Sequence, residues 1–107
     1  MRRLTKDLYS AKRLDDQSWE VLLCDASHPV FKAHFEGNPL VPAFLQIDIL
    51  SELLDRELIG ITKSKFKQPV LPNDRVVYKV VKQIENAYSV KIFKDDKVAS
   101  EIKVKYA

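Results

Sequence analysis

The amino-acid sequence predicts an α+β fold in which one long apolar helix is wrapped by a curved antiparallel sheet. Residues 42–58 place apolar side chains around most of a helix, which is typical of a helix inside a protein. After Gly60 the apolar period changes from that of a helix to that of a strand. Strand-like residues also precede the helix. Together these three observations favour a helix packed on a sheet.

Size and composition indicate one globular domain. The chain has 107 residues, which predicts a single domain over residues 1–107, and it is 46% hydrophobic and 31% charged. No apolar run approaches the roughly 18 residues of a membrane span, and no apolar block follows the basic start as in a signal peptide. We therefore expect a cytoplasmic location without membrane contact. The net charge of +3 is mild, and no basic and aromatic cluster indicates nucleic-acid binding.

The first elements are predicted to form a hairpin. Leu8–Leu14 and Trp19–Cys24 are strand-like, and the turn-rich residues 15–18 join them. Residues 25–42 are predicted to be an irregular connection. Cys24 is the only cysteine, which excludes an internal disulfide, and it follows an apolar run, so we expect a buried core thiol.

The helix is predicted to start near Pro42, because proline suits the first helical turn, and to stop at Gly60. The remaining chain is rich in valine, tyrosine and isoleucine and contains several turn signals. It predicts four antiparallel strands, at 61–66, 75–84, 88–93 and a last one that includes 101–106.

The residues from His34 to Asp48, HFEGNPLVPAFLQID, combine a base, two glycine/proline corners, a helix start and an acid. Abstraction of a proton next to a carbonyl, followed by loss of water, needs this set of groups. Taken singly, His34 fits a turn or packing residue, and Asp48 fits a solvated stripe with Ser51, Glu52 and Asp55. His28, before Pro29, is interpreted as a structural or loop residue.

Two blocks of sequence together resemble the hotdog-fold 3-hydroxyacyl-[acyl-carrier-protein] dehydratases of the FabA/FabZ type. The first is His34-Phe35-x-Gly37-x-Pro39-x-x-Pro42, with an acid fourteen positions after the histidine, and the second is FKQPVLPND at 66–74. The resemblance implies a hotdog fold and a homodimer, or a higher oligomer, that joins two sheets edge to edge. It also implies active sites at the dimer interface, with His34 from one subunit and Asp48 from the other.

The activity that the resemblance implies is elimination of water from 3-hydroxyacyl thioesters to give trans-2-enoyl thioesters. The acyl chain is expected on an acyl carrier protein, in fatty acid or polyene-type lipid biosynthesis. No metal or redox cofactor is expected for this elimination. A hotdog acyl thioesterase and a non-catalytic acyl-binding subunit are the alternatives.

Within this scheme each candidate residue has a role. His34 is the base, and Asp48 donates the proton that leaves with the hydroxyl group, with burial raising its pKa. Backbone N–H groups near the thioester oxygen are assigned to Gly37, Ala43 and Phe44. The acyl channel is assigned to Phe35, Pro42 and Leu45, although Phe44 and Leu45 fit ordinary core equally well.

Three lysines are candidates for binding a partner protein, and three other positions depart from the family pattern. Lys63, Lys65 and Lys67 alternate along one strand, which fits either a solvated face or a docking patch for an acidic carrier protein. Ala43 stands where the family usually has glycine, and Glu52 where many members have glutamine. Asn73 replaces a corner glycine, which is tolerable because asparagine accepts a positive φ.

Overall fold

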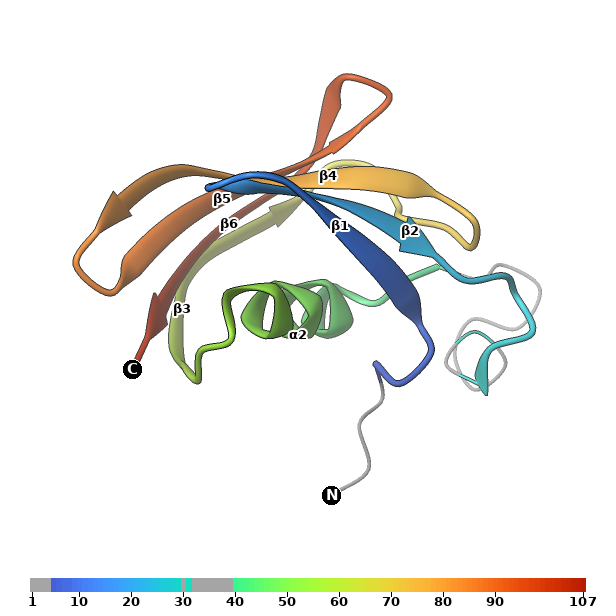
Figure 1. Ribbon diagram of the computed structural model, residues 1–107, viewed down its shortest axis with the longest axis horizontal. Coiled ribbons are helices and arrows are strands. Elements are labelled where there is room, and N and C mark those ends of the chain that lie inside the picture. The colour runs from blue at the N-terminus through green and yellow to red at the C-terminus, as the bar shows by residue number, and fades with distance from the viewer. Residues whose placement is uncertain (1–4, 30, 32–39) are drawn as a thin grey trace.

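The computed structural model describes residues 5–29, 31 and 40–107. Figure 1 shows one curved sheet that arches over helix α2 (Ala43–Leu54). In the described residues the strands are β1 (Tyr9–Asp15), β2 (Ser18–Leu23), β3 (Leu58–Phe66), β4 (Arg75–Ile84), β5 (Ala87–Lys94) and β6 (Lys97–Tyr106). Their order in the sheet is β1-β2-β4-β5-β6-β3, and every neighbouring pair is antiparallel. The predicted α+β arrangement is therefore confirmed.

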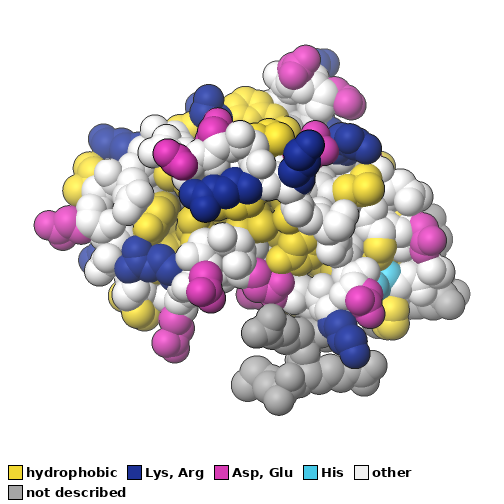
Figure 2. All heavy atoms as spheres, viewed as in Figure 1, with side chains coloured by type: hydrophobic (Ala, Val, Ile, Leu, Met, Phe, Trp, Pro, Cys, Tyr) yellow, Lys and Arg dark blue, Asp and Glu magenta, His cyan; other side chains and the backbone are white. Residues whose placement is uncertain are grey.

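The core lies between the concave face of the sheet and the helix. In β6, Ile102 and Val104 are buried whereas Lys103 and Lys105 are exposed, as the alternation of a strand predicts. Leu50 of α2 is fully buried in the same cluster. Figure 2 shows the molecule from the same side as Figure 1. Apolar side chains lie in the middle of the visible surface, between sheet and helix, with charged side chains around them. Burial of this apolar surface is the main force that holds the helix in place.

The predicted end of the helix at Gly60 is wrong. Helix α2 ends at Leu54, and Asp55 takes the left-handed conformation, with φ 52° and ψ 49°. Leu58 and Gly60 instead lie in β3, where Leu58 pairs with Tyr106 and Gly60 with Lys105. A short apolar run fits either period, and here the hydrogen bonds to β6 decide between them.

The other predicted strands are present, with bounds that differ by a few residues at most. The connection at 25–42, predicted to be irregular, is helical at Pro29 and Phe31, so the prediction is wrong there.

Cys24 is less buried than the sequence predicts. It follows β2 and is only half-buried, and it packs on the rim of the core. Partial burial, together with the nearby Asp25 carboxylate, raises the pKa of its thiol. A raised pKa disfavours the thiolate, so the interpretation of Cys24 as a packing residue rather than a nucleophile is supported.

Turns with positive φ connect several strands. Asn73 has φ 66°, as expected for the corner where it replaces glycine. The loop between β5 and β6 consists of Asp95 and Asp96, with φ 52° and 65°, a combination that type I′ hairpin turns require. Aspartate is tolerated in this conformation, but glycine is favoured at the second position.

Replacing Asp96 with glycine is expected to raise the free energy of unfolding by about 0.5 kcal/mol, because glycine removes the steric cost of a positive φ. Urea denaturation followed by circular dichroism measures the change. Asp16→Gly is the matched control, since Asp16 lies in the turn between β1 and β2 and has no positive φ. The control should lose stability, and an equal gain in both variants would contradict this account.

Candidate functional site

The described residues contain one half of the predicted site. His34, the predicted base, lies outside the described residues, as do Phe35 and Gly37. Asp48, Ala43, Phe44, Pro42 and Leu45 belong to α2 or the residue before it. The convergence of His34 and Asp48 therefore stays a prediction, and the described part of the site is the helix that carries the acid.

Within the described residues, the start of α2 has backbone donors without a hydrogen-bond acceptor. Pro42 precedes the helix in an extended conformation, φ −58° and ψ 152°, and no side chain caps the helix. Its carbonyl accepts the first helical hydrogen bonds, from Leu45 N at 3.1 Å and Gln46 N at 3.2 Å. The N–H groups of Ala43 and Phe44 thus have no acceptor within the helix, and both residues are exposed. These donors and the helix dipole favour a negative charge at this end.

The two channel candidates beside the helix start are buried. Pro42 is buried, and Leu45 is fully buried in the core cluster. In the single chain Leu45 therefore packs as ordinary core. Phe44 is different, because 49% of its surface is exposed. Its exposed ring is an apolar surface next to the backbone N–H groups of Ala43 and Phe44, where an acyl chain could bind.

Asp48 lies on the outer face of α2. It is exposed, while its neighbours Leu45 and Ile47 face the core. Partial desolvation and, after it, the charge of Glu52 raise the pKa of the Asp48 carboxyl group. This increase in the pKa of Asp48 agrees with the role of a proton donor. Asp48 is, however, exposed and is not enclosed by its apolar neighbours, contrary to the prediction from the sequence.

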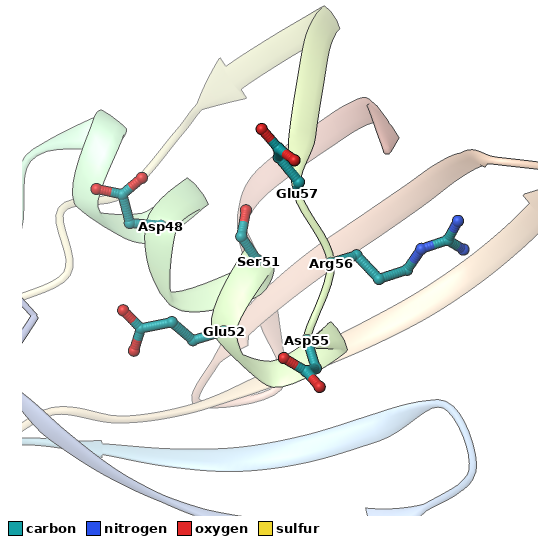
Figure 3. Close-up of a pocket in the computed structure, with 6 residues that line it drawn as sticks. All are labelled: Asp48, Ser51, Glu52, Asp55, Arg56 and Glu57. Carbon is teal, nitrogen blue, oxygen red and sulfur yellow. The ribbon is translucent and has the colours of Figure 1, made fainter. Parts of the chain in front are cut away.

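Asp48 lines a shallow pocket with a volume of about 450 Å³ (Figure 3). The side chains that line it come from α2 and the turn after it: Asp48, Ser51, Glu52, Asp55, Arg56 and Glu57. Arg56 points away from the carboxylates in Figure 3 and donates hydrogen bonds to the Tyr88 hydroxyl group at 2.9 Å and to Asn86 Oδ1 at 3.0 Å. The pocket is therefore acidic. The stripe of polar residues expected from the sequence is present.

Glu52 is the best-held carboxylate of this pocket. It accepts a hydrogen bond from the Thr5 hydroxyl group and another from the Tyr9 hydroxyl group at 2.7 Å. Thr5 is buried and Tyr9 is half-buried. The sequence identified Glu52 as a member of the polar stripe and as a departure from the family pattern, but not its partners, which lie more than forty residues away without a local signal.

A buried polar residue ties the helix to the sheet. Gln46 is 3% exposed and donates from Nε2 to the Val41 carbonyl oxygen at 3.2 Å. Its Oε1 accepts from Ser100 Oγ of β6 at 2.8 Å, and its backbone oxygen accepts from the Tyr78 hydroxyl group of β4 at 3.0 Å. Buried polar groups need such partners. All polar atoms of the Gln46 side chain are thus used within the core.

Strand β3, at one edge of the sheet, carries two of the predicted docking lysines, Lys63 and Lys65, and the third, Lys67, directly follows it. Lys63, Lys65 and Lys67 are exposed, as both interpretations of them require. Lys67 forms a salt bridge with Glu101 at 3.7 Å. The same strand exposes Ile59 and Ile61, whose exposed fractions are 63% and 51%. Within the described residues no strand pairs with its outer side.

The second histidine, His28, contacts a backbone carbonyl group and an aromatic ring. His28 Nε2 lies 2.7 Å from the Lys6 carbonyl oxygen, and its ring contacts Phe31 edge-on. The interpretation of His28 as a loop contact is thereby supported. In the part of the chain that the structure describes, no group of three or more His, Cys, Asp or Glu side chains could hold a metal ion, and no helix is long and apolar enough to cross a membrane.

Comparison with protein families and curated enzymes gives consistent matches. The family described as "ApeI-like: ApeI dehydratase" matches residues 11–103. The FabZ 3-hydroxyacyl-[acyl-carrier-protein] dehydratase of Rhizobium rhizogenes is 31% identical over 90 residues, which are 72% of this chain and 57% of that enzyme. The FabZ of Thermotoga neapolitana is 34% identical over 89 residues, covering 74% of this chain and 65% of that enzyme. The chain thus spans less than two thirds of the length of these two enzymes.

Solved structures with the same fold include two different kinds of protein. The dehydratase heterocomplex ApeI:P from Xenorhabdus doucetiae superimposes with a TM-score of 0.71 at 20% identity, covering 92% of this chain and 94% of that one. Thioesterase superfamily member 2 from Mus musculus gives a TM-score of 0.60 at 9% identity, covering 92% of this chain and 81% of that one. At these identities the likeness establishes the fold, and the predicted hotdog fold is confirmed.

Proposed function

Because the chain belongs to the ApeI-like dehydratase family, we propose that it removes water from 3-hydroxyacyl thioesters to give trans-2-enoyl thioesters. The observation that carries the proposal is the placement of Asp48. An exposed carboxyl group with a raised pKa lies on the same short helix as the free N–H groups of Ala43 and Phe44. An acid and a group that stabilises an oxyanion are two of the three components that the elimination needs.

In the proposed reaction, His34 takes the proton from C2 of the acyl chain. The electron pair left on C2 moves into the thioester as an enolate, whose oxygen accepts hydrogen bonds from the N–H groups at the start of α2. The pair then returns to form the C2–C3 double bond, and the C3–O bond breaks. Asp48 donates its proton to the departing oxygen, so that water leaves and no cofactor is consumed.

The proposal includes assembly of two copies of a single domain, residues 1–107. Within the described residues, strand β3 is an edge whose outer side pairs with no strand, and it has exposed apolar side chains, a feature that commonly pairs with another strand. Pairing at β3 would unite two sheets and bring His34 of one copy to Asp48 of the other. The similar structure from Xenorhabdus doucetiae is described as a dehydratase heterocomplex, so a second, different subunit is the alternative partner. Light scattering after gel filtration distinguishes the two.

We further propose that the substrate arrives on an acyl carrier protein, in cytoplasmic synthesis of fatty acids or polyene-type lipids. The lysines of β3 support this partner, because Lys63 and Lys65 are exposed and form no salt bridge within the part of the chain that the structure describes. A carrier protein with an acidic surface would neutralise them. Enzyme activity on carrier-bound substrate that falls with added salt, and activity on a small thioester that does not, would support docking.

One assay tests the function. Purified protein is given a 3-hydroxyacyl thioester, and the absorbance of the conjugated enoyl group is followed together with release of free thiol. A dehydratase forms the enoyl group without releasing thiol. A thioesterase would release thiol, and an acyl-binding subunit would do neither. Either of these two results would overturn the proposal.

A further inference from the structure

The carboxylate of Glu52 is fixed next to Asp48 by the N-terminal segment. Of its two hydroxyl donors, Thr5 precedes β1 and Tyr9 is the first residue of that strand, and Glu52 itself lies one helical turn after Asp48. Figure 3 shows Asp48 and Glu52 pointing to the same side of the helix. An exposed glutamate ordinarily turns into solvent, where its charge is screened. Here the two hydroxyl groups hold that charge in place.

We propose that Glu52 is a positioning residue for the reaction: held by Thr5 and Tyr9, it keeps a negative charge one helical turn from Asp48 and thereby favours the proton-carrying form of Asp48. This inference rests on the proposed function, in which Asp48 must hold a proton to give it to the leaving hydroxyl group. Like charges four residues apart on a helix repel each other. The repulsion is relieved when Asp48 binds a proton.

Among the described residues, the other groups around Asp48 add no nearby positive charge. On and after α2 the pocket contains Asp55 and Glu57, which are further acids, and Arg56, whose guanidinium group is engaged with Tyr88 and Asn86. From β6 the Tyr106 hydroxyl group faces Ser51 at 3.2 Å. Partial burial, as the largest cause, raises the pKa of Tyr106, so this phenol stays neutral. Glu52 is thus the charge held closest to Asp48 along the helix.

Direct titration of Asp48 tests the inference without any use of enzyme activity. Side-chain carbonyl signals of ¹³C-labelled aspartate are followed by NMR against pH, and Asp48→Asn identifies the signal of Asp48. Glu52→Gln keeps the shape and the hydrogen-bond acceptor but removes the charge, so the midpoint for Asp48 should move to lower pH. Tyr9→Phe loosens the side chain of Glu52 and should move the midpoint in the same direction by a smaller amount.

Asp55→Asn is the matched control. It removes a carboxylate from the same pocket two turns away, and asparagine tolerates the left-handed backbone of residue 55. The control should change the midpoint less than Glu52→Gln does. An unchanged midpoint in Glu52→Gln, or equal changes in Glu52→Gln and Asp55→Asn, would overturn the inference.

The pH profile of turnover adds a readout that separates this inference from the proposed function. With less protonated Asp48 in Glu52→Gln, the pH optimum should move to lower pH and the rate at pH 8 should fall several-fold. A lower rate with an unmoved optimum would mean a merely structural effect and would contradict the inference. If wild type shows no dehydration at all, the proposed function fails, while the NMR titration still decides the effect of Glu52.

Discussion

Replacing Asp48 with asparagine is expected to lower the rate of enoyl thioester formation by about 10²–10⁴-fold, the usual contribution of a positioned proton donor. Asparagine has nearly the same shape but cannot give up a proton to the leaving hydroxyl group. Because Asp48 is exposed and its carboxylate forms no hydrogen bond within the described residues, the fold should stay intact. The enoyl absorbance assay measures the rate, and circular dichroism checks the fold.

Asp55→Asn again serves as the comparison, since it removes a carboxylate from the same pocket without removing the proposed donor. It should retain turnover close to wild type. His34→Ala should lose turnover to a similar extent as Asp48→Asn, because base and acid act on one molecule of substrate. Full activity in Asp48→Asn would remove that residue from the mechanism.

Replacing Leu50 with alanine is expected to lower the free energy of unfolding by about 2–5 kcal/mol. Leu50 is 0% exposed and lies where α2 packs on the sheet. Truncation loses buried apolar surface and leaves a cavity that the surrounding strands cannot fill. For a chain of this size the loss is a large part of the total stability.

Urea denaturation of both proteins measures this loss from the two transition midpoints. Leu14→Ala is the control of the same chemistry, because 49% of Leu14 is exposed on β1. It should cost well under 1 kcal/mol, as surface truncations usually do. Equal losses in the two variants would show that helix packing is not the dominant contribution.

Much of the fold could be predicted because each element carries its own pattern. The bounds of β4, Arg75–Ile84, were predicted without error, since its valine-rich run lies between clear turn residues. The end of α2 could not be predicted in the same way. Residues 58–61 are apolar and fit either a helix or a strand, and their pairing with β6 is a tertiary effect.

In the candidate site too, residues marked by a local pattern could be predicted, and residues defined by tertiary contacts could not. Asp48 could be chosen from sequence because a motif of fixed spacing marks it. The sequence marks Glu52 by its type but predicts no role for it, since Thr5 and Tyr9 reach it only in the folded chain. Gln46 did carry a signal: a polar residue on an otherwise apolar helix indicates a buried partner, and Ser100 is that partner.

The hydrogen bonds of Gln46 have a consequence for the surface of the protein. Apolar contacts have no preferred direction, so by themselves they would let the helix rotate about its own axis. Hydrogen bonds are directional, and those that link Gln46 to Ser100 and Tyr78 forbid this rotation. A rotation by one residue, about 100°, would carry Asp48 away from the outside. The direction in which the helix presents its acid is therefore set from the interior, by an amide shielded from solvent.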